Sequence, residues 1–169
     1  MTRIIVVGDS LAGKTKMLQL ATIGHIRHNV FRSTQIEEYE PIAGATFCVA
    51  PGGITDANLQ QLCVGADGLV VVYRSSSSIN AGQRWLRRMR RLVSVTARVP
   101  VLICCNGSEQ LSCHRLCSVL REYPMAEHTH ISETDICGTR DCINRIVYRV
   151  RRESPSPLVI VRLSTESYR

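Results

Sequence analysis

The sequence predicts an α/β domain in which a mostly parallel β-sheet is covered by helices on both faces. Apolar runs of strand length alternate with helical segments along the chain, the order that crossover connections between parallel strands produce. The longest apolar runs, 68–73 and 99–105, show no alternation with polar residues. Strands of that kind are buried on both faces. The 169 residues suffice for one domain with a core of its own.

Each expected element follows from its local pattern. Residues 3–7 form a short β-branched strand that ends at Gly8, and a helix starts at Lys16. The remaining expected elements are strands at 45–50, 68–73, 99–105 and 128–131, and helices at 57–64, 84–93, 112–122 and 139–152. Ligands of such sheets bind at the carboxyl ends of the strands. The loops in which we expect a site therefore follow Val7, Ala50, Tyr73, Cys105 and Ile131.

The segment GDSLAGKT (8–15) is a full match to the strand–loop–helix signature that binds phosphates. In such a loop, glycines let backbone N–H groups turn inward, and the following helix adds the positive end of its dipole. Lys14 then reaches the β- and γ-phosphates, and Thr15 offers a hydroxyl to Mg²⁺. A structural glycine turn is the alternative interpretation. We expect nucleotide binding by Asp9, Ser10, Leu11, Ala12, Gly13, Lys14, Thr15 and Lys16.

The net charge of +7 comes almost wholly from arginine, because Lys14 and Lys16 are the only lysines. The densest basic stretch is 84–93, where Trp85 and Met89 belong to one apolar helical stripe and the arginines lie on the other faces. We interpret these arginines as the solvated face of an amphipathic helix. A patch for nucleic acid or an acidic membrane is the alternative.

The eight cysteines are expected to be thiols. The first apolar run is too short for a secretory signal, and no other stretch is long enough to cross a bilayer, so we expect a cytoplasmic protein. Cys104 and Cys105 lie in an apolar run, where thiols behave as small hydrophobes. Cys113 and Cys117 lie one helical turn apart beside His114, but no second ligand pair has matching spacing, so we expect no zinc site.

These motifs together resemble those of the Ras-superfamily small GTPases, and the Rab and Rab-like branch in particular. The phosphate-binding loop is similar to that family's first motif, and EYEPIAGATF (38–47) to its first switch. VPVLICCNGSE (99–109) is similar to the strand and loop that read guanine, and HISETDICGTRDCINRIVYRVR (130–151) to the last base-contacting loop and final helix. The resemblance covers 3–152. It implies the Ras-like G domain, a P-loop NTPase fold, with GTP or GDP and Mg²⁺ as ligands.

The base-reading motifs depart from the family pattern. Asn106 is kept from Asn-Lys-x-Asp, the lysine is Gly107, and the aspartate is Glu109, a carboxylate with one extra methylene. Ser132 matches the serine of the Ser-Ala-Lys loop, and Glu133 follows it. The resemblance therefore implies base contacts from Asn106, Glu109, Ser132 and Glu133, with weakened selectivity for guanine.

The switch regions depart further. The threonine that the family offers to Mg²⁺ falls on Ile42 by pattern and on Thr34 by distance from Thr15, and both assignments stay open. After Phe47 there is no Asp-x-x-Gly-Gln, and the interval to Gly65 is too short for the family's hairpin, so we expect a shortened region between the switches. Without that carboxylate and glutamine, we expect GTP hydrolysis to be slow or absent.

The domain is expected to span 1–153. Beyond it, SPSP (154–157) breaks structure, and LVIVRL (158–163) predicts an extra strand within a C-terminal tail of 154–169. The tail carries no terminal cysteine to prenylate, so we expect no lipid anchor and recruitment through a protein partner.

Two functions of different kinds are expected. The first is a guanine-nucleotide switch or adaptor that binds an effector protein, as a monomer or a complex subunit, and does not bind nucleic acid. The alternative is a pseudo-GTPase scaffold subunit of an intracellular transport or trafficking complex, with nucleotide structural or dispensable. A small P-loop kinase is disfavoured, because no lid-like segment or second catalytic arginine cluster is present near a substrate site.

Overall fold

The computed structural model describes residues 2–26, 34–92, 99–107, 113–132 and 134–153. Within these residues one sheet has the strand order β2-β3-β1-β4-β5-β6, in which only the β2–β3 pairing is antiparallel. The strands are β1 (Thr2–Val7), β2 (Glu37–Ile42), β3 (Ala45–Val49), β4 (Gly68–Arg74), β5 (Val101–Asn106) and β6 (Ala126–Ile131). The helices are α1 (Lys14–Ile23), α2 (Asp56–Leu62), the short η1 (Ser75–Ser77), α3 (Ser78–Leu92), α4 (Cys113–Glu122) and α5 (Ile136–Glu153).

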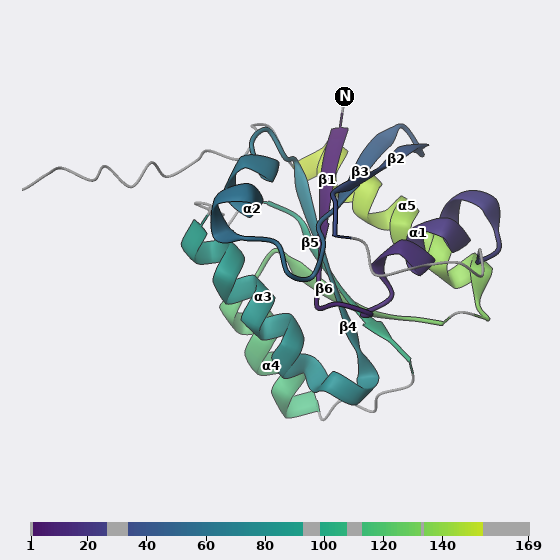
Figure 1. Ribbon diagram of the computed structural model, residues 1–169. Helices are drawn as coiled ribbons and strands as arrows, with labels where there is room; N and C mark the ends of the chain where they lie inside the picture. Colours follow the sequence, from purple (N-terminus) through teal and green to yellow (C-terminus); the bar gives the residue numbers. More distant parts are fainter. Residues whose placement is uncertain (1, 27–33, 93–98, 108–112, 133, 154–169) are drawn as a thin grey trace, which may run out of the picture.

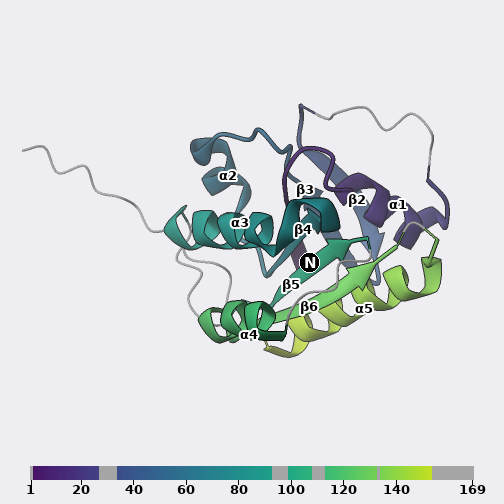
Figure 2. The same ribbon diagram turned by 90° about the horizontal axis from the view of Figure 1, so that it is seen from below.

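Helices cover both faces of the sheet. Figures 1 and 2 show α1 and α5 on one face and α2, α3 and α4 on the other. Successive β1 residues accordingly enter different cores: Ile4 and Val6 pack towards α1 and α5, and Ile5 and Val7 towards the other three helices. All four side chains are fully buried. The expected α/β fold, with buried and largely parallel strands, is confirmed.

Helices α1 and α3 begin earlier in the structure than the sequence predicts. Helix α1 begins at Lys14 rather than Lys16, directly after Gly13, whose φ of 97° is left-handed. Helix α3 begins at Ser78, several residues before the arginine-rich stretch that indicated it. The serines between β4 and α3, expected to be a loop, contribute η1 and the start of α3.

A β-hairpin lies where the sequence analysis expected none, so that expectation is wrong. Strand β2 pairs with β3 from Glu37 opposite Val49 to Ile42 opposite Ala45. The residues EEYEPI were missed because an edge strand needs no continuous apolar run, and a proline is tolerated there. The chain after β3 is short, with one seven-residue helix, α2, before β4.

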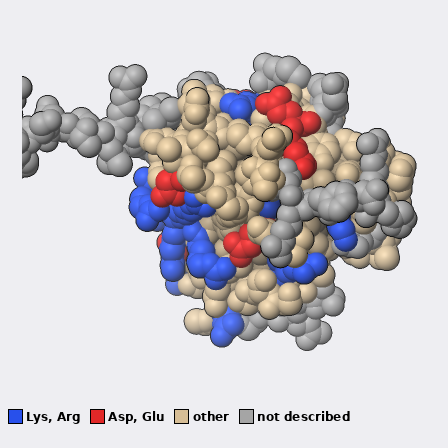
Figure 3. Space-filling view, viewed as in Figure 1, with Lys and Arg blue, Asp and Glu red and all other residues tan. Residues whose placement is uncertain are grey.

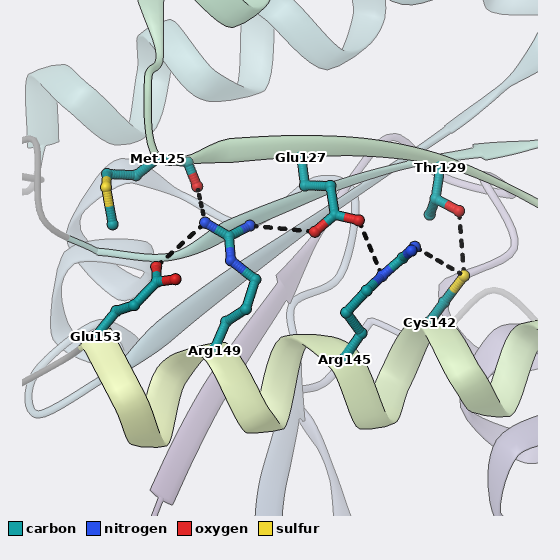
Figure 4. Close-up of polar contacts among 7 residues, drawn as sticks. All are labelled: Met125, Glu127, Thr129, Cys142, Arg145, Arg149 and Glu153. Atoms are coloured by element: carbon teal, nitrogen blue, oxygen red, sulfur yellow. Dashed lines mark hydrogen bonds and ion pairs between the residues drawn. The ribbon is translucent and has the colours of Figure 1, made fainter.

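Ion pairs connect α5 with the edge strand β6 (Figure 4). The Glu127 carboxylate of β6 forms ion pairs with Arg145 Nε at 2.9 Å and with Arg149 Nη1 at 3.4 Å. Arg149 Nη2 also donates to the Met125 carbonyl at 3.0 Å and pairs with Glu153 at 3.3 Å. These contacts hold the C-terminal half of α5 against β6.

The expected burial of Cys104 and Cys105 is confirmed. Cys104 and Cys105 are fully buried in β5, and burial raises the pKa of the Cys104 thiol well above its usual value. Cys117 lies exposed on α4, and the described residues contain no cluster of three or more potential metal ligands. The tail, 154–169, with its expected strand, lies outside the described residues.

Candidate functional site

The loop of residues 8–13 joins β1 to α1 at the carboxyl edge of the sheet, so the eight expected phosphate-binding residues lie together there. Ala12 N donates to Asp9 O at 3.1 Å, which closes a turn. Leu11 takes a left-handed φ of 63°, and its side chain is half exposed. A Cβ on Gly13 would collide with the side chain of Asn106, so only glycine allows the loop to approach β5 this closely.

The side chain of Lys14 lies inside this loop. Lys14 is only 8% exposed, and its ammonium donates to the carbonyls of Gly8 at 2.8 Å and Asp9 at 2.9 Å. Burial lowers the pKa of Lys14 from 10.5 to about 8, opposed by the nearby charges of Asp9 and Glu37. The loop therefore holds the buried positive charge of Lys14 beside the N-terminus of α1. This arrangement favours the binding of an anionic ligand.

Two of the residues expected to contact a base, Asn106 and Ser132, adjoin the same loop. Asn106 Nδ2 donates to the Ala12 carbonyl at 3.2 Å. A small hollow beside this contact is lined by Gly13, Lys16, Met17, Leu20, Asn106, Ile131, Ser132 and Thr139. Thr139 is 1% exposed, and its hydroxyl has no hydrogen-bond partner among the described residues. The hollow thus places an amide, two hydroxyls and apolar surface next to the phosphate-binding loop.

Two expected base contacts are not located, because Glu109 and Glu133 lie outside the described residues. Ser132 is described, and its Oγ is within 2.9 Å of Thr134 Oγ1 and accepts from Thr134 N at 3.2 Å. Gly107 stands in place of the family's lysine with a φ of 119°, and a Cβ there would collide with Ser75. The backbone therefore excludes a lysine at this position.

The assignment of Ile42 to the first switch is wrong. Because β2 runs antiparallel to β3, Ile42 pairs with Ala45, and Ala45 pairs with Thr2 at the start of β1. That is the edge of the sheet opposite the phosphate-binding loop. Thr34, the alternative, precedes β2 on the loop side, and it is exposed.

Glu37 is a site residue that sequence reasoning missed. It is the first residue of β2, and its Oε2 accepts hydrogen bonds from Thr15 Oγ1 at 3.0 Å and Tyr39 Oη at 3.2 Å. Recognising the β2–β3 hairpin would have revealed it, since the hairpin's register brings Glu37 back to the loop. The Thr15 hydroxyl and the Glu37 carboxylate are hard oxygen donors, and such a set fits Mg²⁺.

Residues 50–54, which follow β3 directly, carry no polar side chain. Ala50, at the end of the strand, is fully buried, and Ile54 is 7% exposed in the core under α2 and α3. Gly52 approaches the loop so closely that a Cβ would collide with Ser10. Asp56, the nearest acid, is paired with Arg88 at 2.7 Å and with Arg91 at 2.9 Å. The hydrogen bond from Arg88 is the largest cause that lowers the pKa of Asp56, which indicates a structural role.

Helix α3 is tied to the phosphate-binding loop through Asp9. The Trp85 indole N–H donates to Asp9 Oδ1 at 2.8 Å, and Arg84 Nη2 pairs with Asp9 Oδ2 at 3.1 Å. Arg88 lies over the Trp85 ring, 4.9 Å from its centroid. The carboxylate of Asp9 therefore faces α3, and the backbone of Asp9 is what remains to bind phosphate.

The arginines of α3 form a blue area in the space-filling view (Figure 3). Four of them pair with three carboxylates: Arg84 with Asp9, Arg88 and Arg91 with Asp56, and Arg90 with Glu122 at 3.8 Å. Arg87 is exposed and has no acidic partner among the described residues. This pairing favours our interpretation of a solvated helix face.

No protein-family model and no curated protein matches this sequence. Among solved structures, the chain is similar to Methanosarcina barkeri Roco2 RocCORdC bound to GDP, with a TM-score of 0.67 and 18% identity. The similarity covers 90% of this chain and 49% of that chain, so the chain spans about half of its neighbour's length. The fold is that of a P-loop GTPase-like G domain.

Within the described residues, no helix combines the length and the apolar character that crossing a membrane requires.

Proposed function

We propose that this chain is a guanine-nucleotide-binding protein of the small-GTPase type, which binds GTP and GDP with Mg²⁺ and acts as a switch or adaptor. The observation that carries the proposal is the contact between two motifs far apart in the sequence. Asn106 Nδ2 donates to the Ala12 carbonyl at 3.2 Å, so the phosphate-binding loop and the hollow for a base adjoin. The solved structure with the same fold is a GDP complex, which supports the choice of ligand.

In this proposal, different groups of the protein bind the phosphates, the cation and the base. The buried Lys14 ammonium and the N-terminus of α1 attract the phosphates, and Thr15 holds the cation. Asn106, Ser132 and Thr139 line the hollow for the base, and Glu109 is proposed to read guanine as the family's aspartate does. Bound Mg²⁺ would neutralise phosphate charge.

We propose that hydrolysis is slow or absent. Attack on the γ-phosphoryl group needs a positioned water and stabilisation of the developing charge. Ala50 and Ile54 supply neither, because both side chains are apolar and buried. The output of the protein is therefore a binding event, and we propose an effector protein or a complex as its partner.

The finer placement rests on the sequence resemblance. We propose that the chain belongs to the Rab-like branch and is a cytoplasmic protein. A pseudo-GTPase scaffold in a trafficking complex is the second candidate, favoured by the absence of an Asp-x-x-Gly-Gln motif after Phe47.

A titration of nucleotide-stripped protein with GTP, GDP and ATP, each with and without Mg²⁺, tests the proposal. We expect guanine nucleotides to bind more tightly than ATP, with Lys14→Ala abolishing binding and Arg87→Ala, a charge-matched change on the exposed face of α3, leaving it intact. Affinity that differs between GTP and GDP supports a switch, and equal affinity supports a structural nucleotide. If no nucleotide binds, the proposal is wrong and the scaffold is favoured.

A further inference from the structure

The hydroxyl of Thr15 is bonded to a carboxylate that no family motif supplies. Thr15 Oγ1 donates to Glu37 Oε2 at 3.0 Å, and Tyr39 Oη donates to the same oxygen at 3.2 Å. Among the described residues, no donor is bonded to Glu37 Oε1. Glu37 Oε2 thus lies beside the threonine that is expected to hold Mg²⁺, and the carboxylate keeps lone pairs that these two hydrogen bonds do not use.

The register of the hairpin explains why Glu37 reaches this place. Glu37 is the first residue of β2 and pairs with Val49, the last residue of β3. Ala50, the next residue after β3, occupies the strand end where the resemblance implies a carboxylate, and it has none. The carboxylate that is missing after β3 therefore has a counterpart in Glu37, which lies on the neighbouring strand β2.

The spacing of the oxygens suits one small cation. Mg²⁺ takes octahedral oxygen ligands at about 2.0–2.1 Å, so neighbouring ligands lie about 2.8–3.0 Å apart. The 3.0 Å between Thr15 Oγ1 and Glu37 Oε2 matches that separation. Mg²⁺ is commonly bound by only one or two carboxylates together with phosphate oxygens and water, so one carboxylate suffices.

We propose that Glu37 is a direct carboxylate ligand of the divalent cation held by Thr15 and the nucleotide phosphates, in place of the acid missing at Ala50. The inference rests on the proposed function, because the phosphates complete the coordination. Tyr39 positions Glu37 through its hydrogen bond.

Glu37→Gln removes the charge and keeps an oxygen that accepts from Thr15 and Tyr39, so the fold is expected to persist. The matched control is Glu38→Gln. Glu38 is the next residue on the strand, and its carboxylate lies instead 3.6 Å from Cys48 Sγ. GDP affinity is measured by calorimetry over a range of Mg²⁺ concentrations and in EDTA, and Mn²⁺ binding to the GDP complex is measured by electron paramagnetic resonance.

We expect Glu37→Gln to raise the half-saturating Mg²⁺ and Mn²⁺ concentrations by at least about 10- to 100-fold, because loss of an outer-shell partner alone has an effect of that size and Glu37 is proposed to be a direct ligand. Affinity for GDP in EDTA is expected to be unchanged, and Glu38→Gln is expected to behave as the parent. Equal cation affinity in all three proteins overturns this inference while leaving the proposed function standing. Tighter cation binding by Glu37→Gln also overturns it, since Glu37 would then compete with the cation. If the parent binds no GDP in any condition, the proposed function itself fails.

Discussion

The Trp85 indole N–H donates a hydrogen bond to the Asp9 carboxylate at 2.8 Å and so joins α3 to the phosphate-binding loop. Trp85 is the only tryptophan in the chain. Its emission therefore reports on a bond made by the loop itself. From Trp85 the contacts continue through Arg88 to Asp56 at the start of α2.

Asp9→Ala tests the energetic weight of this link. The change leaves the buried indole N–H without its acceptor, and an unpaired buried donor costs about 1–3 kcal/mol. We expect urea denaturation, followed by circular dichroism, to show that loss of stability. Asp141→Ala, an exposed aspartate of α5, is the control and should change stability by less than about 0.5 kcal/mol. Equal effects of the two changes would show that the Trp85 bond contributes nothing.

Gly52→Ala tests how closely the chain after β3 approaches the loop. A Cβ at Gly52 would collide with the backbone N and Oγ of Ser10, whereas a Cβ at Gly53 meets nothing within 4 Å. We expect Gly52→Ala to destabilise the protein by about 1–3 kcal/mol and to weaken GDP binding. Gly53→Ala should do neither. Thermal unfolding and a GDP titration of both variants measure the contrast, and similar results for the two would contradict the close approach.

His128 predicts a loss of stability in acid. Its Nε2 lies 2.9 Å from the Tyr73 hydroxyl, and burial, with the charge of His130, lowers its pKa from 6.5 to about 4. Between those values the unfolded chain binds a proton that the folded protein does not, so stability falls as the pH falls from 6.5 to 4. Because the ring is only partly buried, we expect solvent to limit the effect to about 1 kcal/mol.

Denaturation of the parent and His128→Asn at pH 7 and pH 4.5 isolates this contribution. The parent should lose about 1 kcal/mol more than the variant over this range. His114→Asn, on the exposed face of α4, should follow the parent. A variant that loses as much stability as the parent would show that His128 is not responsible.

Thr139→Val tests the buried hydroxyl of the hollow. The Thr139 hydroxyl is unpaired among the described residues, so replacing it with an apolar group of the same shape should raise the free energy of unfolding by about 1 kcal/mol. Thr22→Val makes the same change in a hydroxyl that donates to the Leu18 carbonyl at 2.8 Å, and it should not stabilise the protein. Destabilisation by Thr139→Val would show that the hydroxyl has a partner in solution.

The sequence was sufficient for the fold because its signals are local. The buried strands show as unbroken apolar runs, and the loop of 8–15 follows a fixed spacing of glycines, lysine and threonine. These patterns predicted the parallel sheet and located Lys14 and Thr15. They also predicted that no carboxylate follows β3, where Ala50 lies.

The errors arose where pairing between strands decides the position. Ile42 matched a motif by its neighbours in sequence, but the antiparallel register of β2 carries it to the far edge of the sheet. The same register brings Glu37 to Thr15, which no spacing rule indicates, because side-chain contacts across a sheet depend on register. Asp9 and Trp85 lie 76 positions apart in the sequence, so no local pattern predicted their hydrogen bond.

The alternation of β1 divides the protein into two apolar compartments that share only the sheet. Ile4 and Ile5 are adjacent in the chain, yet one belongs to the compartment of α1 and α5 and the other to that of α2, α3 and α4. Substitutions in the two compartments are therefore expected to accumulate independently during evolution, each layer compensating its own packing. The bonds of Asp9 to Arg84 and Trp85 connect the loop in front of α1 with α3, and so constrain the two layers jointly.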